Sequence, residues 1–316
     1  MWRPTATIDN LKLRAKLLAR IRQFFAEKEV LEVETPLLCH STIPDQNILS
    51  FSSSYKLPGI DETLYLQTSP EFAMKRLLAA GAPSIYQICK AFRYEGYGKQ
   101  HNPEFTILEW YRLGFDHHKL MQEMDEFLQF LIQTKPAHKI TYQELFIEHL
   151  NLDPIKATYS EIKNCAIKNG LNHMEGLSKD DWLDLLLTHK IEKQLGKNNK
   201  PTFIYNYPKS QAALAKLNED KLTAARFEVY IEGVELANGF YELTSANEQR
   251  QRFLDDLKKR EALGIATVPL DERFLQALEH GLPDCAGVAL GIDRLLMAKS
   301  GVRNISEVLS FNVTCA

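Results

Sequence analysis

Residues 92–112, FRYEGYGKQHNPEFTILEWYR, hold the pattern that decides the fold. A strand-like run leads into Arg93, and a second strand-like run begins at Phe105 after a polar loop with two glycines. Two apolar, aromatic-rich runs joined by such a loop predict an antiparallel hairpin. The loop also places fixed positive charge beside aromatic rings, which favours an anion-binding role for the hairpin.

The segments around the hairpin alternate between helical and strand-like patterns. Apolar residues at helical spacing predict a helix over residues 9–28 with Asp9 as its cap, and residues 37–62 predict a loop. Helical periodicity then dominates the middle of the chain, and strands return after it. We therefore predict the α+β fold class, with an antiparallel β-sheet flanked by helices. Residues 1–316 are expected to form one domain, with a mainly helical insert around 116–200.

Charge and composition restrict the possible partners and compartment. The formal net charge is -3, so the chain has no basic surplus for broad nucleic-acid binding. Its five cysteines are scattered and never spaced as CxxC, which predicts thiols in a reducing compartment. No apolar run approaches the ~18 residues of a membrane span. These features predict a cytoplasmic protein with no membrane partner.

Three stretches combine polar residues with strand-like or glycine-rich sequence. They are the opening hairpin, EVYIEGVELANGFYEL (228–243) and GVALGIDR (287–294). Any single polar residue among them is equally well interpreted as the solvent-facing position of a half-buried strand. Because polar residues recur on three separate segments, we expect the three segments to meet at one site.

The residue types in these stretches suit a nucleotide and a cationic small molecule. Guanidinium groups bind phosphate oxygens through paired hydrogen bonds, as Arg93 would. Glu235 and Glu242 can hold Mg²⁺, which usually takes one or two carboxylates together with phosphate oxygens and water. Phe105 offers a face for a purine, and Arg294 can stack from the other side. The carboxylates of Glu71 and Glu109 remain to receive ammonium groups.

The same stretches resemble the motifs of class II aminoacyl-tRNA synthetases, specifically of the lysyl branch. FRYEGYGKQHNPEFTILEWY (92–111) resembles the second motif, GVALGIDRLLM (287–297) the third, and FFAEKEVLEVETPLL (24–38) the first. TSPEFAMKRLL (68–78) and ELANGFYEL (235–243) are further lysyl-branch signatures. The resemblance covers nearly the whole chain and implies the class II catalytic fold, ATP and Mg²⁺ as cofactors, and a homodimer.

Two departures from lysyl-tRNA synthetases change the expected acceptor and amino acid. Only about eight residues precede the first-motif helix, so we expect no OB-fold anticodon-binding domain. Ala289 stands where those enzymes have glycine, and one methyl group in a pocket can discriminate by ~1–3 kcal/mol. Both departures resemble a bacterial paralogue that attaches (R)-β-lysine to a lysine of translation elongation factor P. This implies an AMP-forming ligase with elongation factor P, and not tRNA, as its macromolecular substrate.

The resemblance also implies a role for each matching residue. Arg93 and Arg294 would be catalytic through charge stabilisation at the phosphates. The implied nucleotide-binding residues are Arg93, Glu95, His101, Asn102, Phe105, Glu235, Leu236, Gly291 and Arg294, with Glu235 and Glu242 as the metal ligands. The implied substrate-binding residues are Ser69, Pro70, Glu71, Glu109, Tyr111, Asn238, Glu242 and Ala289. Within the second set, Glu71 and Glu109 would meet the amino group near the carboxylate, Asn238 the carboxylate, and Tyr111 with Glu242 the distal ammonium.

Two other functions remain as alternatives. One is a freestanding enzyme that adenylates α-lysine and charges tRNA or another acceptor. The other is a non-catalytic, synthetase-like amino-acid sensor. A sensor would be expected to lose its phosphate and magnesium residues, whereas Arg93, Glu235, Glu242 and Arg294 are all present.

Overall fold

The computed structural model describes residues 2–171 and 176–316, and its chain divides into two compact units. The first unit contains the chain up to Gly114 together with Leu243–Cys285 and Ala289–Ala316. The second contains Phe115–Glu242 and Ala286–Val288. The single domain expected from the sequence stays a prediction, and each unit is described by itself.

The first unit begins with a long amphipathic helix. Helix α1 (Ile8–Glu27) buries Leu17, Ile21, Phe24 and Phe25. Its cap is Thr7, whose hydroxyl accepts a hydrogen bond from the Asn10 backbone, so the prediction of Asp9 as the cap is wrong. Asp9 lies in the first turn instead, where a carboxylate still stabilises the positive end of the helix dipole.

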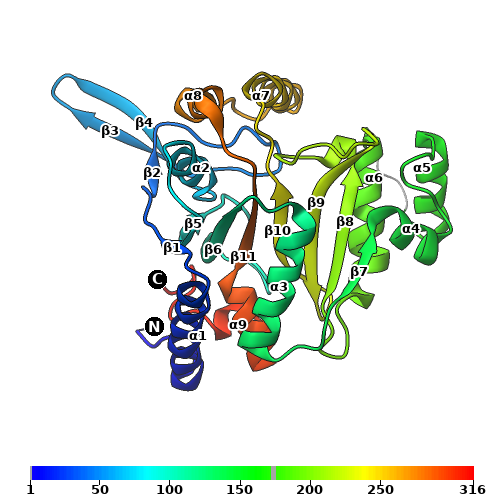
Figure 1. Cartoon of the computed structure of the whole chain (residues 1–316), viewed down its shortest axis with the longest axis horizontal. Coiled ribbons are helices and arrows are strands. Elements are labelled where there is room, and N and C mark those ends of the chain that lie inside the picture. The colour runs from blue at the N-terminus through cyan, green and yellow to red at the C-terminus, as the bar shows by residue number, and fades with distance from the viewer. Residues whose placement is uncertain (1, 172–175) are drawn as a thin grey trace. The chain divides into compact units, whose positions relative to one another are not determined.

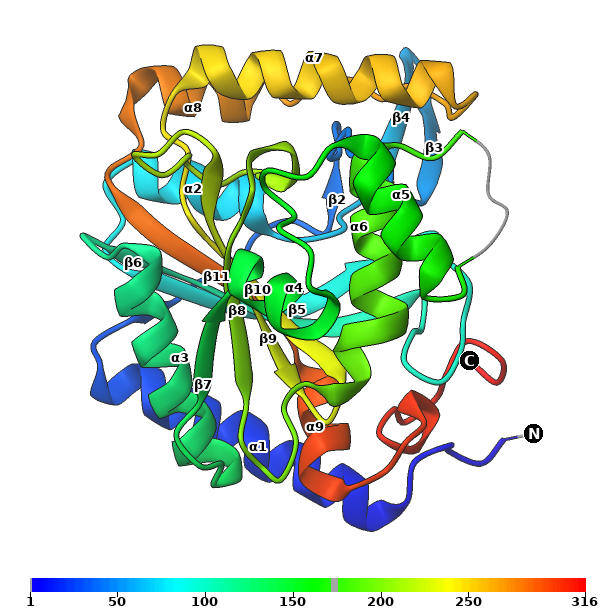
Figure 2. The same cartoon turned by 90° about the vertical axis from the view of Figure 1, so that its right-hand side faces the viewer.

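The strands of the first unit form the predicted hairpin and its neighbours. Their order is β1 (Leu31–Glu32), β5 (Ile85–Phe92), β6 (Glu104–Leu113) and β11 (Cys285–Gly291), of which Ala286–Val288 are assigned to the second unit. Strands β5 and β6 are antiparallel from the pair Ile85↔Tyr111 to the pair Phe92↔Glu104, which confirms the hairpin. Figure 2 shows α2 (Glu71–Ala79), α7 (Ala246–Ala262) and α8 (Glu272–Gly281) on one side of these strands, and α1 and α9 (Ile292–Ser300) on the other.

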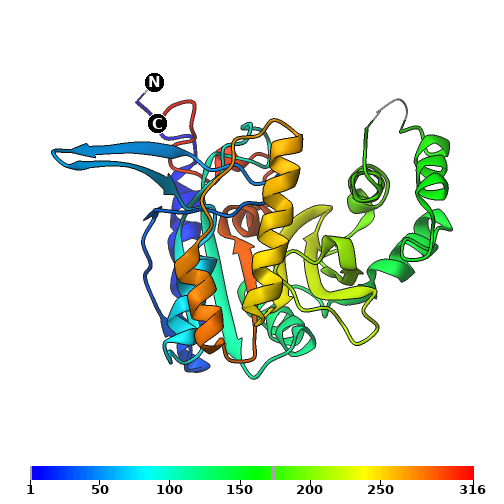
Figure 3. The ribbon, with the colours of Figure 1, turned by 90° about the horizontal axis from the view of Figure 1, so that it is seen from above.

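A second, three-stranded sheet replaces the loop predicted for residues 37–62. Its order is β2 (Leu38–Cys39), β4 (Ile60–Leu66) and β3 (Ser52–Leu57). The β3–β4 hairpin projects away from the other strands of the first unit (Figures 1 and 3). All six residues of β3 are exposed, so the segment lacks the apolar alternation that identifies a strand in a sequence. The prediction of a loop was wrong because backbone pairing, and not a buried face, defines this hairpin.

The second unit packs helices against a four-strand series with the order β10, β9, β8, β7. Its core surrounds the buried Trp182, Tyr142 and Phe146. The helices α4, α5 and α6 each begin with a capping box, in which a Thr or Ser side chain and an acidic side chain three residues later bond each other's backbone N–H. The elements are α3 (His117–Ile132), β7 (His138–Thr141), α4 (Tyr142–Leu150), α5 (Tyr159–Lys168), α6 (Lys179–Leu186), β8 (Thr202–Pro208), β9 (Thr223–Ile231) and β10 (Val234–Tyr241).

Short helical turns complete the described chain. They are η1 (Leu187–Ile191), η2 (Glu192–Gln194) and η3 (Lys209–Gln211) in the second unit and η4 (Ile305–Glu307) in the first. The pairs β5–β6, β8–β9, β9–β10, β2–β4 and β3–β4 are antiparallel, whereas β1–β5 and β7–β8 are parallel. Helices flank these strands, which confirms the predicted α+β class. Among the described residues, no helix combines the length and apolar character needed to cross a lipid bilayer.

Candidate active site

The first unit gathers a cationic group around the loop of the β5–β6 hairpin. Arg93 follows directly after β5, and its backbone N–H donates to the carbonyl of Pro103 at 2.9 Å, which closes the loop. The Arg93 guanidinium carbon lies 5.2 Å from the ring centroid of Phe105, close enough for a cation–π contact. The hairpin therefore holds a cation and an aromatic face together, as the sequence predicted for this motif.

Arg294 joins this group from the start of α9. Its Nη2 donates to Nε2 of His101 at 2.9 Å. Burial, together with the charges of Arg294 and Arg93, lowers the pKa of His101, while the charge of Glu95 opposes them. Because a guanidinium can only donate, Nε2 of His101 must accept, which requires the neutral imidazole. Arg93, Glu95, His101 and Arg294 thus lie within electrostatic reach of one another.

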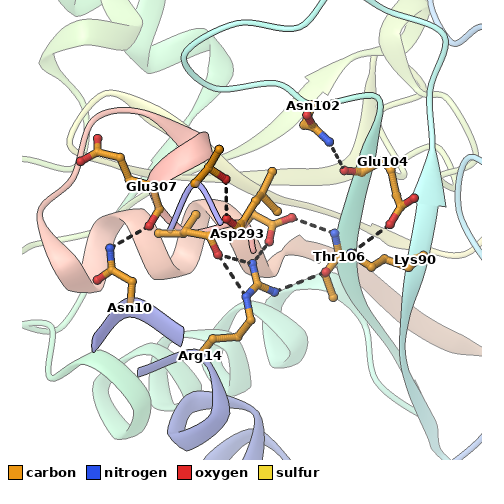
Figure 4. A network of polar contacts seen from close by, with 11 residues as sticks. Asn10, Arg14, Lys90, Asn102, Glu104, Thr106, Asp293 and Glu307 are labelled. Atoms are coloured by element: carbon orange, nitrogen blue, oxygen red, sulfur yellow. Dashed lines mark hydrogen bonds and ion pairs between the residues drawn. The ribbon is translucent and has the colours of Figure 1, made fainter. Parts of the chain in front are cut away.

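A buried carboxylate fixes the helix that carries Arg294. Asp293 is 2% exposed, accepts a hydrogen bond from the Thr106 backbone at 2.8 Å, and forms an ion pair with Arg14 of α1. Arg14 also donates to the carbonyl of Val308 through Nε and Nη2 (Figure 4). Elements from all three predicted motifs, α1, β6 and α9, are therefore tied together one residue from Arg294.

Asn102 belongs to the same region but contacts different partners. Its Nδ2 donates to the carbonyl of Glu104 at 2.6 Å, and its Oδ1 accepts from the backbone of Val313 at 3.0 Å. The side chain is 6% exposed, and both ends of its amide bond backbone groups. These contacts shape the loop and attach it to the C-terminal segment.

A second cluster in the first unit is acidic. Glu109 of β6 is 2% exposed and accepts hydrogen bonds from Tyr111 at 2.5 Å and from Ser69 at 2.7 Å. Ser69 Oγ in turn accepts from the backbone of Glu71, the first residue of α2. Pro70, also buried, lies between them. The structure therefore brings Ser69, Pro70, Glu71, Glu109 and Tyr111 together, as predicted for an amino-acid pocket.

A buried lysine that the sequence did not single out enters this cluster. Lys75 Nζ lies 2.5 Å from Glu71 Oε1, and its side chain is only 1% exposed. It also lies 6.0 Å from the ring centroid of Tyr111 and 5.8 Å from that of Phe274. Lys75 follows Glu71 by four residues on α2, a spacing typical of helical ion pairs, and that spacing is the signal that would have found it.

Glu109 has an altered acidity in this setting. Burial and the neighbouring charge of Glu71 raise the pKa of Glu109 to about 7, against the opposing effects of Tyr111, Ser69 and Lys75. A carboxyl in this environment is partly protonated near neutral pH. A positive group that binds beside Glu109 would favour its ionised form, because a nearby cation stabilises the carboxylate.

The second unit carries further predicted site residues on β10, paired with polar residues of β9. The register between these strands shifts between Glu235 and Ala237, so Leu236 is an extra residue, a β-bulge. Glu235 pairs with Tyr230 and Asn238 pairs with Glu228, and Tyr230 and Glu228 lie on one face of β9. The bulge therefore puts Glu235 on the same face as Asn238, although an odd spacing separates them.

Several polar side chains extend this face of β9 and β10. Glu228 accepts hydrogen bonds from the hydroxyls of Tyr207 and Tyr230, each at 2.6 Å, and forms a 2.5 Å ion pair with Arg226. Glu242, just beyond β10, is 1% exposed, and Leu236 is 4% exposed. Arg226 and Glu228 were not assigned a role from the sequence, where they alternate with apolar residues like surface positions.

The remaining predicted residues lie around β11 in the first unit. Ala289 is half-buried on β11, and Gly291 is the N-cap of α9. Within the described part of the chain, no three His, Cys, Asp or Glu side chains form a metal-binding group. A pair of carboxylates nevertheless fits Mg²⁺, which takes its other oxygens from phosphates and water.

Comparison with known proteins identifies the family to which these motifs belong. A family model described as tRNA synthetases class II (D, K and N) matches residues 1–314. The chain belongs to this family. Membership confirms the predicted class II fold and implies an enzyme that uses ATP.

Two relatives in this class II family illustrate the similarity. The elongation factor P–(R)-beta-lysine ligase of Vibrio parahaemolyticus is 50% identical over 315 residues, which cover 98% of this chain and 97% of that protein. The protein of the same name from Salmonella typhi is 47% identical over 317 residues, which cover 99% of this chain and 97% of that protein. The resemblance drawn from the sequence motifs is thus confirmed.

Proposed function

We propose that the enzyme activates (R)-β-lysine with ATP and transfers it to the ε-amino group of a lysine on translation elongation factor P. The similarity to ligases of that name, at 47–50% identity over nearly the whole chain, is the observation that carries this proposal. The cationic group, the acidic cluster and the carboxylates of Glu235 and Glu242 supply the residue types that both half-reactions need.

In the first half-reaction, a carboxylate oxygen of the amino acid attacks the α-phosphorus of ATP. A bond forms from that oxygen to phosphorus, and the bond from phosphorus to the pyrophosphate oxygen breaks. We assign Arg93 to the α-phosphate and Arg294 with neutral His101 to the remaining phosphates. Fixed guanidinium groups of this kind stabilise the charge that develops on the transferring phosphoryl group.

The nucleoside part of ATP would lie against the other residues of the same loop. We assign the purine to the face of Phe105, the adenine edge to Glu95, and the shape of this region to Gly291 and Leu236. Asn102, whose amide bonds the backbone at both ends, is proposed to hold the loop in place. Glu235 and Glu242 would hold Mg²⁺, which when bound neutralises phosphate charge.

The acidic cluster is proposed to bind the ammonium groups of the amino acid. Glu109 and Tyr111 share a hydrogen bond, so we infer that both meet the same ammonium group, and not the two different groups that the resemblance implied. Glu71 would contribute a carboxylate that Lys75 already partly neutralises. Glu242 remains a proposed ligand of the distal ammonium, Asn238 of the carboxylate, and Ala289 a determinant of the pocket's shape.

In the second half-reaction, the ε-amine of the acceptor lysine attacks the carbonyl carbon of the adenylate. A new amide bond forms, and the bond from the carbonyl carbon to the phosphate oxygen breaks and releases AMP. Neither half-reaction requires a nucleophilic side chain of the enzyme. Positioning and charge stabilisation are sufficient for both.

We further propose that the enzyme is a cytoplasmic homodimer that uses no tRNA. Apolar side chains that follow α1 support the dimer, because Leu31 and Leu38 are 50% and 45% exposed. In the same unit, a cavity of about 680 Å³ includes Leu18, Phe92 and Phe311 among its lining residues. Sedimentation of the purified protein should give about twice the chain mass of 36.2 kDa, and a monomer would contradict this assignment.

The function is tested by asking which macromolecule becomes labelled. The enzyme is incubated with ATP and labelled (R)-β-lysine in the presence of both elongation factor P and lysine tRNA, and the reaction is repeated with labelled α-lysine. We expect the label from (R)-β-lysine on one lysine of elongation factor P. A labelled tRNA would support the α-lysine adenylating alternative, and no pyrophosphate exchange with either amino acid would support the sensor.

Two controls make this labelling experiment specific. Elongation factor P with its acceptor lysine replaced by arginine should remain unlabelled, because arginine offers no neutral amine. The Arg93→Ala enzyme should bind the same macromolecules but form little adenylate. Label that persists in both controls would indicate a contaminating activity.

A further inference from the structure

The side chain of Asn238 has a fixed orientation in the second unit. Asparagine carries an acceptor oxygen and a donor NH₂ group that are nearly identical in shape, so its orientation depends on its neighbours. Nε of Arg226 donates to Oδ1 of Asn238 at 3.3 Å. Because a guanidinium has no acceptor atom, the oxygen of the amide must face Arg226, and the NH₂ group must point elsewhere.

Arg226 is itself held from several directions. Its Nη2 donates to Glu228 Oε1 at 2.5 Å, and its Nη1 donates to the backbone carbonyl of Gln211 at 2.7 Å. The ring centroid of Tyr207 lies 4.5 Å from its guanidinium carbon. The side chain of Arg226 is 17% exposed and that of Glu228 is 9% exposed, so this ion pair is largely shielded from water.

The charge of Arg226 is permanent in this environment. Burial by itself would lower its pKa, but the charges of Glu228 and Glu235 and the hydrogen bond to Glu228 outweigh burial, and the pKa is raised. Two tyrosine hydroxyls, from Tyr207 and Tyr230, fix the second oxygen of Glu228. Arg226 is therefore a permanently protonated donor, and its partner Glu228 is itself held in place by two hydroxyl groups.

We propose that Arg226 is a positioning residue that orients the amide of Asn238 to donate to the carboxylate of the amino-acid substrate. This inference rests on the proposed function, in which Asn238 binds that carboxylate. A carboxylate can only accept hydrogen bonds, so an amide turned the other way would present its oxygen and repel the substrate. Glu228 balances the charge of Arg226, so the effect reaches the substrate through the orientation of Asn238.

The Arg226→Lys variant removes this contact and retains the ion pair. Lysine keeps a positive charge for Glu228 but has a methylene group where arginine has its Nε–H. Binding is measured by calorimetry for (R)-β-lysine and for the amino alcohol in which CH₂OH replaces the carboxylate. We expect the dissociation constant of (R)-β-lysine to rise ~10-fold, the usual cost of a hydrogen bond to a charged group, and that of the amino alcohol to change less than ~2-fold.

Two further variants separate positioning from general damage. Gln211→Ala keeps the backbone carbonyl that accepts from Arg226 but removes the side-chain hydrogen bond to Asp184, and should leave the binding of both ligands unchanged. Asn238→Ala should weaken binding of (R)-β-lysine about as much as Arg226→Lys does. Adding Arg226→Lys to Asn238→Ala should then have no further effect on the amino acid, because the contact that it controls is already gone.

The results distinguish the inference from the proposed function. Equal weakening of the amino acid and the amino alcohol by Arg226→Lys, or no weakening of either, would overturn the positioning role. If the wild-type enzyme binds α-lysine and not (R)-β-lysine, the proposed substrate is wrong, and the same comparison between α-lysine and lysinol still tests Arg226. A wild-type enzyme that binds neither amino acid would overturn both.

Discussion

Amino-acid binding is expected to strengthen as pH rises through 7, because Glu109 must lose a proton to pair with an ammonium group. Burial and Glu71 raise the pKa of Glu109 to about 7, while Tyr111, Ser69 and Lys75 act against them. With a pKa of about 7, roughly a tenth of the Glu109 carboxyls are ionised at pH 6 and roughly nine tenths at pH 8. An alkylammonium group with a pKa of about 10.4 stays protonated throughout this range.

The expected KM for the amino acid therefore falls ~10-fold between pH 6 and pH 8. The assay is ATP–pyrophosphate exchange with (R)-β-lysine varied at saturating ATP. The KM for ATP is measured separately at each pH, because His101 is also titratable and contacts Arg294. The stability of the unliganded enzyme should change in the opposite direction. A carboxyl whose folded pKa is raised loses its stabilising contribution as pH rises from about 4.5 to about 7.

Two carboxylate variants on β6 make the test specific. Glu109→Gln cannot titrate, so its KM should be higher than that of the wild type and constant from pH 6 to pH 8. Glu104→Gln removes an exposed carboxylate that pairs with Lys90 on the same hairpin, and should keep the wild-type profile. A wild-type KM that does not change with pH, or a Glu109→Gln enzyme that keeps the ~10-fold fall, would refute the reasoning.

Three other substitutions have defined expectations. Arg93→Ala should lower adenylate formation ~10²–10³-fold, the usual loss for one fixed transition-state donor, and near-normal pyrophosphate exchange would contradict its role. Ala289→Gly should improve use of α-lysine relative to (R)-β-lysine in competing adenylation assays. Unchanged selectivity would contradict the role of Ala289 in shaping the pocket. Gly239→Ala should destabilise the protein by ~1–3 kcal/mol in urea unfolding, since its Cβ would lie 2.4 Å from Phe227 Cζ. Gly96→Ala, with no atom within 4 Å of its Cβ, is the control, and equal stability of the two variants would refute the packing argument.

The sequence predicted the parts of the fold in which side-chain pattern and backbone structure agree. The β5–β6 hairpin consists of two runs rich in aromatic and aliphatic residues on either side of a glycine-containing loop, so its strands and its turn could both be predicted. Helix α1 was predicted for the same reason, although its cap lies at Thr7, two residues earlier than expected. The β3–β4 hairpin was missed because none of the six residues of β3 is buried, and hydrogen bonds of the backbone leave no periodicity in the sequence.

The acidic cluster shows what residue types alone could and could not indicate. Glu71, Glu109 and Tyr111 were expected in an amino-acid pocket, and the structure places them in one network with Ser69. The buried Lys75 was not expected, because lysine is rarely fully buried unless paired, and in TSPEFAMKRLL only its spacing of four residues from Glu71 indicates the ion pair. Its presence changes the electrostatics of the pocket, since one of the two carboxylates already has a cationic partner.

The strand β10 shows most clearly why the candidate site needed a structure. In an unbroken strand, side chains alternate between faces, so Glu235 would lie on the opposite face from Asn238. The bulge at Leu236 reverses this relation, because one extra residue moves every following side chain to the other face. No residue in ELANGFYEL identifies a bulge, so the resemblance could assign roles to Glu235 and Asn238 without explaining how one face presents both. The same reversal places Asn238 beside Glu228 and within reach of Arg226, and the amide orientation that we propose for substrate binding depends on that register.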